Sequence, residues 1–466
     1  MAEVADRTRK PIMLVSLPAA GLANPMLVLA GELARRGVQD VIFASDEVRR
    51  ADVEALTAAS KIEFVSLGEQ VPELSPTTWD EPTYRSVTQR SRFGAFRALL
   101  RHNMKPEITV DKHKQLEAAV EAHQPALMVI DVMCRHALDI AITKGIPYVL
   151  SCPFVASNIV SRTTPFGPSY TPDDFPTPRS ALPYPMSAGQ KLRNKLFQLR
   201  TLALFLTPSM GKRVQAAAKI GQELGVSAEA RKPLAGFERA EKVLCYSLPD
   251  LDYPFDVPEK FSFVGAMVPP LPQAPADELT DWLDGHQNVV YMGFGTITRL
   301  TKSDVAALVE VARRVEGKAH VLWSLPKSQQ PLLPADLPAN LRVEGWVPSQ
   351  LDVLAHPNVR VFVNHGGGNA FHESVYFGKP QVVRPLWVDC YDQAVRVQSM
   401  GLGLTVDRPA EINADDLTGK LLPVLGQKTY AEASQRFAAA MTKAGGRTAA
   451  ADLLLSLPQL TETSNS

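Results

Sequence analysis

The chain has 466 residues, of which 45% are apolar, and this length is too great for one ordinary hydrophobic core. Lysine plus arginine and aspartate plus glutamate number 49 each, so the chain has no overall charge to hold nucleic acid or an anionic membrane. We therefore predict two large domains and expect neither a nucleic-acid partner nor another polyanionic one.

The cysteines and the chain ends bear on the compartment. Cys134, Cys152, Cys245 and Cys390 are far apart and mostly lie in apolar runs, which favours reduced core thiols over disulfides. The start MAEVADRTRK is charged and has no apolar signal core, and no stretch approaches the ~20 apolar residues that span a bilayer. We predict a cytoplasmic monomer without an integral membrane segment.

Short apolar runs alternate with helical patterns along the chain, which is typical of parallel sheets wrapped by helices, an α/β class. Nine runs are predicted as strands: Ile12 to Leu17, Asp40 to Ala44, Ala126 to Ile130, Tyr148 to Ser151, Lys242 to Tyr246, Val289 to Gly293, Ala319 to Ser324, Leu341 to Gly345 and Val359 to Val363.

The proline-rich segment VPPLPQAP, Val268 to Pro275, cannot form regular structure and indicates a domain boundary. We expect Lys242 to Tyr246 to be the last strand before it. The predicted division is an N-terminal domain over 1–267, a linker over 268–276, a C-terminal domain over 277–440, and a C-terminal helix and tail over 441–466 that packs back on the N-terminal domain.

Residues 162–184 are rich in Pro, Ser and Thr and precede a basic, apolar pattern over 191–219. Two interpretations apply to this region. A surface loop followed by packed amphipathic helices is favoured over a segment that touches a membrane.

A glycine-rich stretch, HGGGNAFHE from His365 to Glu373, follows the predicted strand VRVFVN. Glycines after a strand let backbone N–H groups approach an anion, and a helix that begins near Asn369 points its positive end at the same place. A diphosphate fits there, with a hydrogen bond from His365, while Glu373 accepts both hydroxyls of a ribose. Alone, a glycine triplet is more typical of a tight turn.

The flanks of this stretch add a base and a sugar site. Trp346 closes a strand before Pro348, so its ring can stack on a flat base, with the backbone of Val347 at the base edge and Gln350 at a ribose hydroxyl. Asp389, which follows the segment PLW, is placed to accept hydrogen bonds from sugar hydroxyls.

Together these residues resemble the nucleotide-sugar signature of family 1 glycosyltransferases, the UDP-glycosyltransferases. The spacing of His365, Glu373 and Asp389 matches, as do the flanking GKP and RPLW, the later VxxxGLGL at 397–404 and VVYMGFGTIT at 289–298. The resemblance implies the GT-B fold, two Rossmann-like domains with parallel sheets that face each other across a cleft. It also implies a uridine diphosphate sugar as donor substrate and no further cofactor. The implied UDP-binding residues are Trp346, Val347, Gln350, His365, Gly367, Gly368, Asn369, Ala370, Glu373 and Thr296, and the implied sugar-binding residues are Trp387, Asp389 and Cys390.

Three positions in this half depart from the family pattern. Ser349 lengthens the usual WxPQ loop by one residue, which leaves open whether Gln350 reaches the ribose. Ala370 stands where a serine commonly contacts the phosphate. In the ungapped alignment, which we favour over one that offsets the pair to Asp392 and Gln393, Cys390 replaces the usual glutamine. This variant resembles the fungal branch of the family. The sugar is therefore less defined than the nucleotide, although family prevalence favours UDP-glucose.

The sequence leaves open which group acts as the catalytic base. Glycosyl transfer to a hydroxyl needs a proton acceptor, and in the family this is a histidine in the first loop, where this chain has Leu22. Its usual partner, Asp131, is retained at the end of ALMVID. Four explanations remain: Asp131 acts as the base, the acceptor is acidic, another imidazole such as His136 or His102 substitutes, or the sugar is bound without turnover. The first two together are favoured.

The segment Asp250 to Asp252 imitates a metal-binding DxD, but a solvated turn is much more common in such a proline-flanked loop. We expect no metal, since a helix dipole and N–H donors can meet the diphosphate charge. The acceptor is expected in the N-terminal domain, near Gly21 and Phe154, between the variable loops 82–105 and 154–206.

The sequence therefore predicts an inverting hexosyltransferase that moves a hexose from UDP to a hydroxyl or carboxyl of a small lipophilic acceptor. A sugar-nucleotide epimerase with the same fold and a catalytically lapsed regulatory protein that binds UDP-sugar remain as alternatives.

Overall fold

The computed structural model describes residues 11–56, 58–406 and 411–461. Two parallel sheets with helices on both faces form its centre, which confirms the predicted α/β class. The first sheet has seven strands in the order β3-β2-β1-β4-β5-β6-β7. Their bounds are β1 (Ile12–Val15), β2 (Val41–Ser45), β3 (Ile62–Ser66), β4 (Leu127–Asp131), β5 (Tyr148–Cys152), β6 (Lys242–Cys245) and β7 (Phe261–Phe263).

The second sheet has six strands in the order β10-β9-β8-β11-β12-β13, again all parallel. Its strands are β8 (Val289–Gly293), β9 (His320–Ser324), β10 (Leu341–Glu344), β11 (Val359–Asn364), β12 (Gln381–Val383) and β13 (Gly403–Thr405). The central strands are buried on both faces, as expected where helices cover both sides of a parallel sheet.

The prediction that Lys242 to Tyr246 is the last strand of the first sheet is wrong, because β7 follows it at the sheet edge. Four strands were not predicted: β3, β7, β12 and β13. The last three are only three residues long, too short for a periodic pattern, and β3 is an edge strand whose apolar run is interrupted by Glu63.

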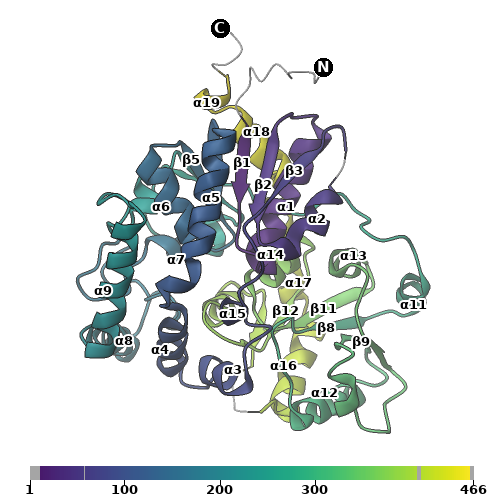
Figure 1. Ribbon diagram of the computed structural model, residues 1–466. Coiled ribbons are helices and arrows are strands. Elements are labelled where there is room, and N and C mark those ends of the chain that lie inside the picture. Colours follow the sequence, from purple (N-terminus) through teal and green to yellow (C-terminus); the bar gives the residue numbers. More distant parts are fainter. Residues whose placement is uncertain (1–10, 57, 407–410, 462–466) are drawn as a thin grey trace.

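Helices of the first half cover the first sheet and extend beyond it (Figure 1). They are α1 (Ala20–Arg35), α2 (Arg50–Glu54), α3 (Glu81–Val87), α4 (Arg92–Asn103), α5 (Val110–His123), α6 (Arg135–Lys144), α7 (Ser157–Val160), α8 (Ala188–Phe205), α9 (Pro208–Glu223) and α10 (Ala235–Glu238). α1 packs on one face of the sheet, and α5 and α6 pack on the other.

The remaining helices are α11 (Glu278–Gly285), α12 (Lys302–Arg314), α13 (Gln350–Ala355), α14 (Gly368–Tyr376), α15 (Cys390–Ser399), α16 (Ala414–Gly426), α17 (Lys428–Lys443), α18 (Gly446–Leu455) and α19 (Pro458–Thr461). α12 and α16 cover one face of the second sheet, while α11, α13 and α14 lie on the other. No helix within the described ranges is both long enough and apolar enough to cross a membrane.

The last helices return to the first sheet. Ala450, Ala451 and Leu454 of α18 are buried in the same core as α1, beside which α18 runs in Figure 1. Arg36 after α1 forms an ion pair with Asp452 at 2.6 Å. The chain thus crosses between the two sheets twice, and this second crossing limits how freely they can separate.

A buried ion pair joins the two halves. The guanidinium of Arg396 on α15 donates a 2.7 Å hydrogen bond to Asp252, whose carboxylate also accepts from the backbone and hydroxyl of Ser157. Asp252 is only 7% exposed. The prediction of a solvated turn is therefore wrong for Asp252, because Arg396 and Ser157 replace its water.

All four cysteines are buried free thiols, as predicted. Cys152 and Cys245 are register partners on β5 and β6.

Candidate functional site

A glycine loop joins β11 to α14 at the carboxyl edge of the second sheet. Gly367 is the N-cap of α14, so the unpaired N–H groups of the first turn and the positive end of the helix dipole point into the space before it. Gly366 has φ +79 and its N–H donates to the side chain of Asn364 at 2.8 Å, which fixes the sharp turn. Ala370 is buried in that first turn and offers only its backbone. This helix start is suited to bind an anion.

His365 lies between two glycines. A Cβ on Gly295 or on Gly367 would come within 2.5 Å of its ring, so both positions need glycine to accommodate the imidazole. The Nδ1 atom is buried without a hydrogen-bond partner among the described residues, and burial lowers the pKa of His365 to about 4. The ring is therefore neutral near pH 7 and holds one N–H donor for an incoming group. Thr296 is exposed next to Gly295.

Glu373, on the second turn of α14, is oriented by Gln350. The Nε2 of Gln350 donates a 2.7 Å hydrogen bond to Oε2 of Glu373, and Gln350 accepts a long one from Tyr291 at 3.4 Å. Burial raises the pKa of Glu373 above its usual value, and the hydrogen bond from Gln350 offsets only part of this rise. Ser349, the additional residue of the loop, caps α13 through its hydroxyl, which accepts from the N–H of Asp352 at 3.1 Å. The structure thus brings Gln350 to the carboxylate, and its contact with a ribose stays a prediction.

Trp346 stands just beyond the end of β10 and is 68% exposed, while Val347 beside it is buried. A large aromatic ring left in solvent at the carboxyl edge of a parallel sheet is suited to stack on a flat ligand. Most large side chains of the second sheet are enclosed, so this exposure is a feature of the site rather than of the core.

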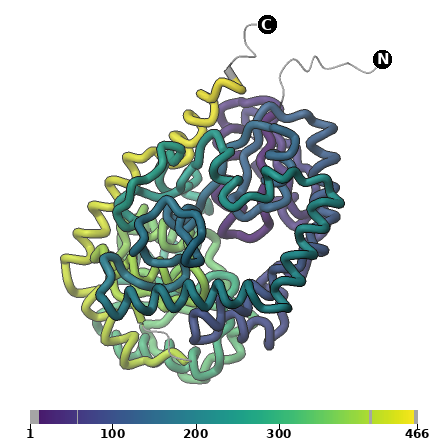
Figure 2. The backbone as a smooth tube through the Cα atoms, turned by 90° about the vertical axis from the view of Figure 1, so that its left-hand side faces the viewer, coloured from purple at the N-terminus to yellow at the C-terminus, as the bar shows by residue number. Residues whose placement is uncertain are grey.

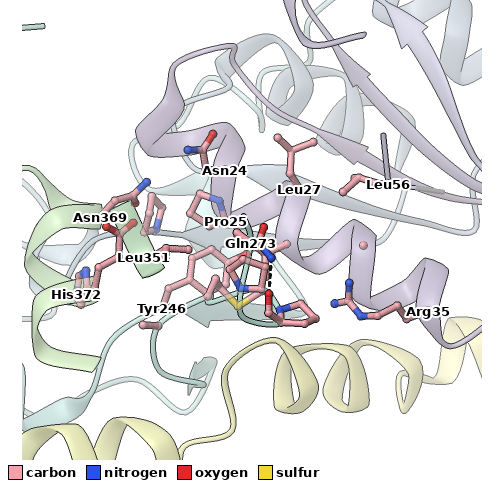
Figure 3. A pocket seen from close by; sticks show the side chains of 18 of the residues that line it. Asn24, Pro25, Leu27, Arg35, Leu56, Tyr246, Gln273, Leu351, Asn369 and His372 are labelled. Carbon is pink, nitrogen blue, oxygen red and sulfur yellow. Dashed lines mark hydrogen bonds between the residues drawn. The ribbon is translucent and has the colours of Figure 1, made fainter. Parts of the chain in front are cut away.

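A cavity of about 490 Å³ lies between α1, the proline-rich segment and the helices α13 and α14 (Figure 3). Glu373, Asn369 and His372 line it from α14, and Asn24 and Leu27 face them from α1. Asn369 also donates to the carbonyl of Ala20 at 3.3 Å. The N-terminal half therefore forms one wall of the space into which Glu373 points.

Gly368 and His372 complete the contact between the halves. A Cβ on Gly368 would lie 3.2 Å from the carbonyl of Pro153, and His372 shares a 2.9 Å hydrogen bond with the hydroxyl of Ser247. Gly368 consequently permits the start of α14 to approach the first sheet.

Two of the predicted sugar-binding residues, Trp387 and Asp389, lie on the loop between β12 and α15, and the third, Cys390, is the first residue of α15. Asp389 is the N-cap of α15 and is partly exposed, and burial raises its pKa to about 6. Trp387 meets Trp79 of the N-terminal half edge to face, with ring centroids 5.7 Å apart. Cys390 is 1% exposed and its backbone packs against Gly366. The thiol is therefore enclosed, whereas Asp389 is partly exposed, and a contact between Asp389 and a sugar stays a prediction.

Asp131, at the end of β4, is 1% exposed. Its carboxylate accepts hydrogen bonds from the N–H groups of Leu17 at 3.2 Å and Met133 at 2.9 Å, and burial raises its pKa to about 7. Leu22 is half-buried in the first turn of α1, Gly21 is exposed with open space around it, and Phe154 packs at the edge of the first core. Asp131 thus holds the start of the loop that leads from Leu17 to Gly21 and Leu22.

The two alternative histidines differ in position. His136 is buried against Cys134 and burial lowers its pKa to about 3, so it belongs to the core. His102 on α4 is half-buried, shares a 2.6 Å hydrogen bond with the carbonyl of Glu73 and meets the ring of Trp79 at 4.9 Å. Of the two, only His102 lies near the loop that carries Trp387.

Arg179 lies next to the candidate site and is a residue that the sequence did not reveal. Its backbone has φ +73 and its N–H donates to Asp392 at 2.5 Å. Its guanidinium lies over the ring of Phe96, 5.2 Å from the ring centroid, and makes no hydrogen bond to the described residues. The negative charges of Asp392 and Asp389 stabilise its positive charge. The loop 162–184 carries no motif, so only the folded chain brings Arg179 to Asp392, on the helix that Asp389 caps.

No three His, Cys, Asp or Glu side chains in the described part of the chain are grouped to hold a metal ion. An anion at the start of α14 would instead meet the helix N–H groups and His365.

Comparison with known proteins places this arrangement among glycosyltransferases. The profile of the family described as "UDP-glucoronosyl and UDP-glucosyl transferase" matches residues 50–440. A curated relative, UDP-glucuronosyltransferase 2C1 of Oryctolagus cuniculus, is 29% identical over 328 residues, which cover 69% of this chain and 61% of that protein. The chain thus spans about three fifths of the length of this relative.

Two solved structures resemble the whole chain. A structure titled as the glycotransferase of kitacinnamycin is 22% identical, covers 96% of this chain and 98% of its own, and has a TM-score of 0.69. A UDP-glucose: anthocyanidin 3-O-glucosyltransferase in complex with UDP is 19% identical, covers 98% and 100% of the two chains, and has a TM-score of 0.64. At these identities the likeness concerns the fold, two parallel-sheet domains of the GT-B type.

Proposed function

The chain belongs to the UDP-glucuronosyl and UDP-glucosyl transferase family, and on this premise we propose that it transfers a hexose from UDP to a small lipophilic acceptor. The observation that supports the proposal most is the position of His365. A neutral imidazole with a buried, unpartnered nitrogen stands between two obligatory glycines before a free helix N-terminus, with Glu373 on the next turn. A diphosphate followed by a ribose fits that order of donors and acceptor.

The leaving group carries the charge that the site must stabilise. As the anomeric bond breaks, negative charge develops on the diphosphate, next to the N–H groups of α14 and His365. These donors are already oriented, so they stabilise the charge without reorganisation. The acceptor oxygen attacks from the opposite side, which inverts the anomeric centre.

Glucose is the proposed hexose on family prevalence, with Asp389 as acceptor of its hydroxyl hydrogen bonds. Because the pKa of Asp389 is raised only to about 6, the carboxylate is mostly ionised at neutral pH and can accept two hydroxyls. Cys390 lies below this surface and supports the loop through its packing against Gly366.

An acidic acceptor best explains how transfer can proceed with Leu22 at the position of the usual histidine base. Both oxygens of Asp131 already accept backbone hydrogen bonds and the group is 1% exposed, which argues against direct contact with an acceptor oxygen. A carboxylic acid or acidic phenol loses its proton without help. Arg179, whose backbone is bonded to Asp392 and whose guanidinium lies over Phe96, would supply a cation for such an acceptor. Asp131 as a base, directly or through water, remains the second route.

The test is to incubate the protein with UDP-glucose and a mixed panel of carboxylic acids, phenols, alcohols and amines, and to measure product masses. We expect an added hexose on acids and phenols, also in excess chelator. Conversion of UDP-glucose to an isomer without acceptor would indicate an epimerase. UDP binding with no product on any acceptor would indicate a regulatory protein, for which Leu22 is the supporting observation.

A further inference from the structure

α8 is an amphipathic helix with its faces reversed. Its buried residues include Asn194, Gln198 and Thr201, whereas three of its leucines face solvent. The buried polar groups are satisfied: Asn194 bonds the backbone of Thr177 and Phe175, and Gln198 donates to the hydroxyl of Thr177. A surface helix in water normally turns its apolar stripe to the core. The reversal here is built in by specific hydrogen bonds.

The exposed stripe is continuous along the helix. Leu192 is 62% exposed, Leu196 43% and Leu199 49%, and Leu206 just after the helix is 75% exposed. The spacings of four, three and seven residues place all four side chains on one face of a helix with 3.6 residues per turn. The helix is firmly started by a capping box between Ser187 and Gln190, so this face is a formed surface.

Basic side chains border the stripe on both sides. By helical geometry Lys191 and Lys195 lie along one edge, and Arg193 and Arg200 along the other. From Ala188 to Gln222, which is all of α8 and all of α9 except its last residue, the chain has no Asp or Glu and has seven basic residues: Lys191, Arg193, Lys195, Arg200, Lys212, Arg213 and Lys219. The last residue of α9, Glu223, pairs with Lys219 at 3.7 Å. The chain as a whole is neutral, and from this we expected no charge that could hold an anionic membrane. The local excess of positive charge on α8 and α9 differs from that expectation.

The surface is open. α8 and α9 lie at the outer edge of the molecule in Figure 1, and Figure 2, which views that side directly, shows both helices in teal in front of the rest of the backbone. Val214 of α9 is also 43% exposed. We call the exposed leucines of 192–206 with their flanking basic residues the α8 face.

We propose that the α8 face docks the protein on the surface of an anionic lipid bilayer. A stripe of leucines flanked by lysine and arginine suits the boundary between acyl chains and head groups, because the leucines enter the apolar region while the basic ends reach anionic head groups. A second copy of the chain is a poorer occupant, since a symmetric contact would place two strongly basic segments against each other.

The inner side of α8 leads toward the candidate site. Phe197 stacks on Phe96 of α4 with centroids 5.9 Å apart, and Arg179 lies over the same ring. A docked helix would thus hold the acceptor side of the protein at the bilayer, where a lipophilic acceptor is concentrated.

The experiment is flotation of the full chain with vesicles of phosphatidylcholine alone or with about a third phosphatidylserine. The apolar variant is Leu192→Gln, Leu196→Gln and Leu199→Gln together. The charge variant is Arg193→Glu with Lys195→Glu, which spares Lys191 because it pairs with Asp174. The matched control is Val48→Gln with Leu337→Gln, two side chains exposed by 56% and 38% elsewhere on the surface. Thermal unfolding checks that every variant is folded.

We expect the wild-type protein to bind anionic vesicles, and this binding should weaken as salt is added. Both α8 variants should reduce the binding by about tenfold or more, and the control variant should retain it. Binding to neutral vesicles should be much weaker. Absence of binding to anionic vesicles at low salt, or equal binding by the apolar variant, would overturn the proposal. A dimer in sedimentation velocity that the apolar variant dissolves, without vesicle binding, would assign the face to a second copy instead.

Discussion

The side chains of Gln350 and Glu373 form a 2.7 Å hydrogen bond that links the start of α13 to the second turn of α14. Gln350 holds Oε2 of Glu373, and Oε1 is left to accept from a ligand. We infer that the amide positions the carboxylate and that the carboxylate is the group that would accept the ribose hydroxyls. This division of roles differs from a direct glutamine contact with the sugar.

Glu373→Gln should therefore raise the KM for UDP-glucose by roughly 10- to 100-fold, since hydrogen bonds to a charged group contribute about 1.5–3 kcal/mol. Gln350→Ala should raise it less, because the carboxylate remains but is less well oriented. Steady-state kinetics with varied donor measure both. An effect of Gln350→Ala larger than that of Glu373→Gln would show that the amide, not the carboxylate, contacts the ribose.

Gly367→Ala tests the glycine cradle of His365. The backbone of Gly367 has φ −62 and ψ 148, which alanine adopts without strain, so the 2.5 Å approach of its Cβ to the imidazole is the only perturbation. We expect a rise of about tenfold or more in the donor KM. The control is Gly419→Ala on α16, where a Cβ meets nothing within 4 Å. Equal donor KM values for the two variants would exclude His365 from the diphosphate site.

The pH dependence separates the two routes for proton removal. If Asp131 is the base, the rate with a neutral alcohol should rise about tenfold per pH unit up to its pKa of about 7 and then level, because only the ionised carboxylate accepts a proton. With a carboxylic acid acceptor, already ionised by pH 6, no such rise is expected.

Asp131→Asn should then lower the rate with the alcohol by about 10²-fold or more and leave the rate with the carboxylic acid nearly unchanged. Equal loss with both acceptors, together with a lower melting temperature, would assign Asp131 a structural role through Leu17 and Met133. An unchanged rate with the alcohol would rule out the carboxylate as the base.

Arg179→Gln tests recognition of an anionic acceptor. Loss of the guanidinium should raise the KM for a carboxylic acid by about tenfold or more and leave the KM for a neutral phenol of similar shape little changed. Arg179→Lys, which keeps the charge but not the planar edge, should recover part of the loss. A parallel loss with both acceptors would mean that Arg179 only neutralises Asp389 and Asp392.

Local patterns predicted most of the fold, and the candidate donor site was proposed from one contiguous stretch of sequence. Buried parallel strands are continuous apolar runs, which is why β8 was predicted with its observed bounds, and the glycine loop is contiguous in sequence from His365 to Glu373. The three-residue strands β7, β12 and β13 are too short to carry a period. Their place is decided by the sheet edge on which they pair.

The rest depends on contacts between residues far apart in the chain. Arg179 meets Asp392 across 213 residues, and Asp252 meets Arg396 across 144, and neither pair has a local signal. The reversed faces of α8 also escape a pattern-based prediction, because a helical period does not say which face is buried. Only the partners Phe175 and Thr177 determine that the polar side points inward.

Calorimetric titration of UDP, without added metal, decides whether the start of α14 is a nucleotide-diphosphate site. The proteins compared are the wild type, Glu373→Gln, Gly367→Ala and the control Gly419→Ala. We predict one site per chain, affinity lower by about tenfold or more in the first two variants, and unchanged affinity in the control. No heat of binding in the wild type, or equal affinity in all four proteins, would exclude a nucleotide-diphosphate site at this helix start.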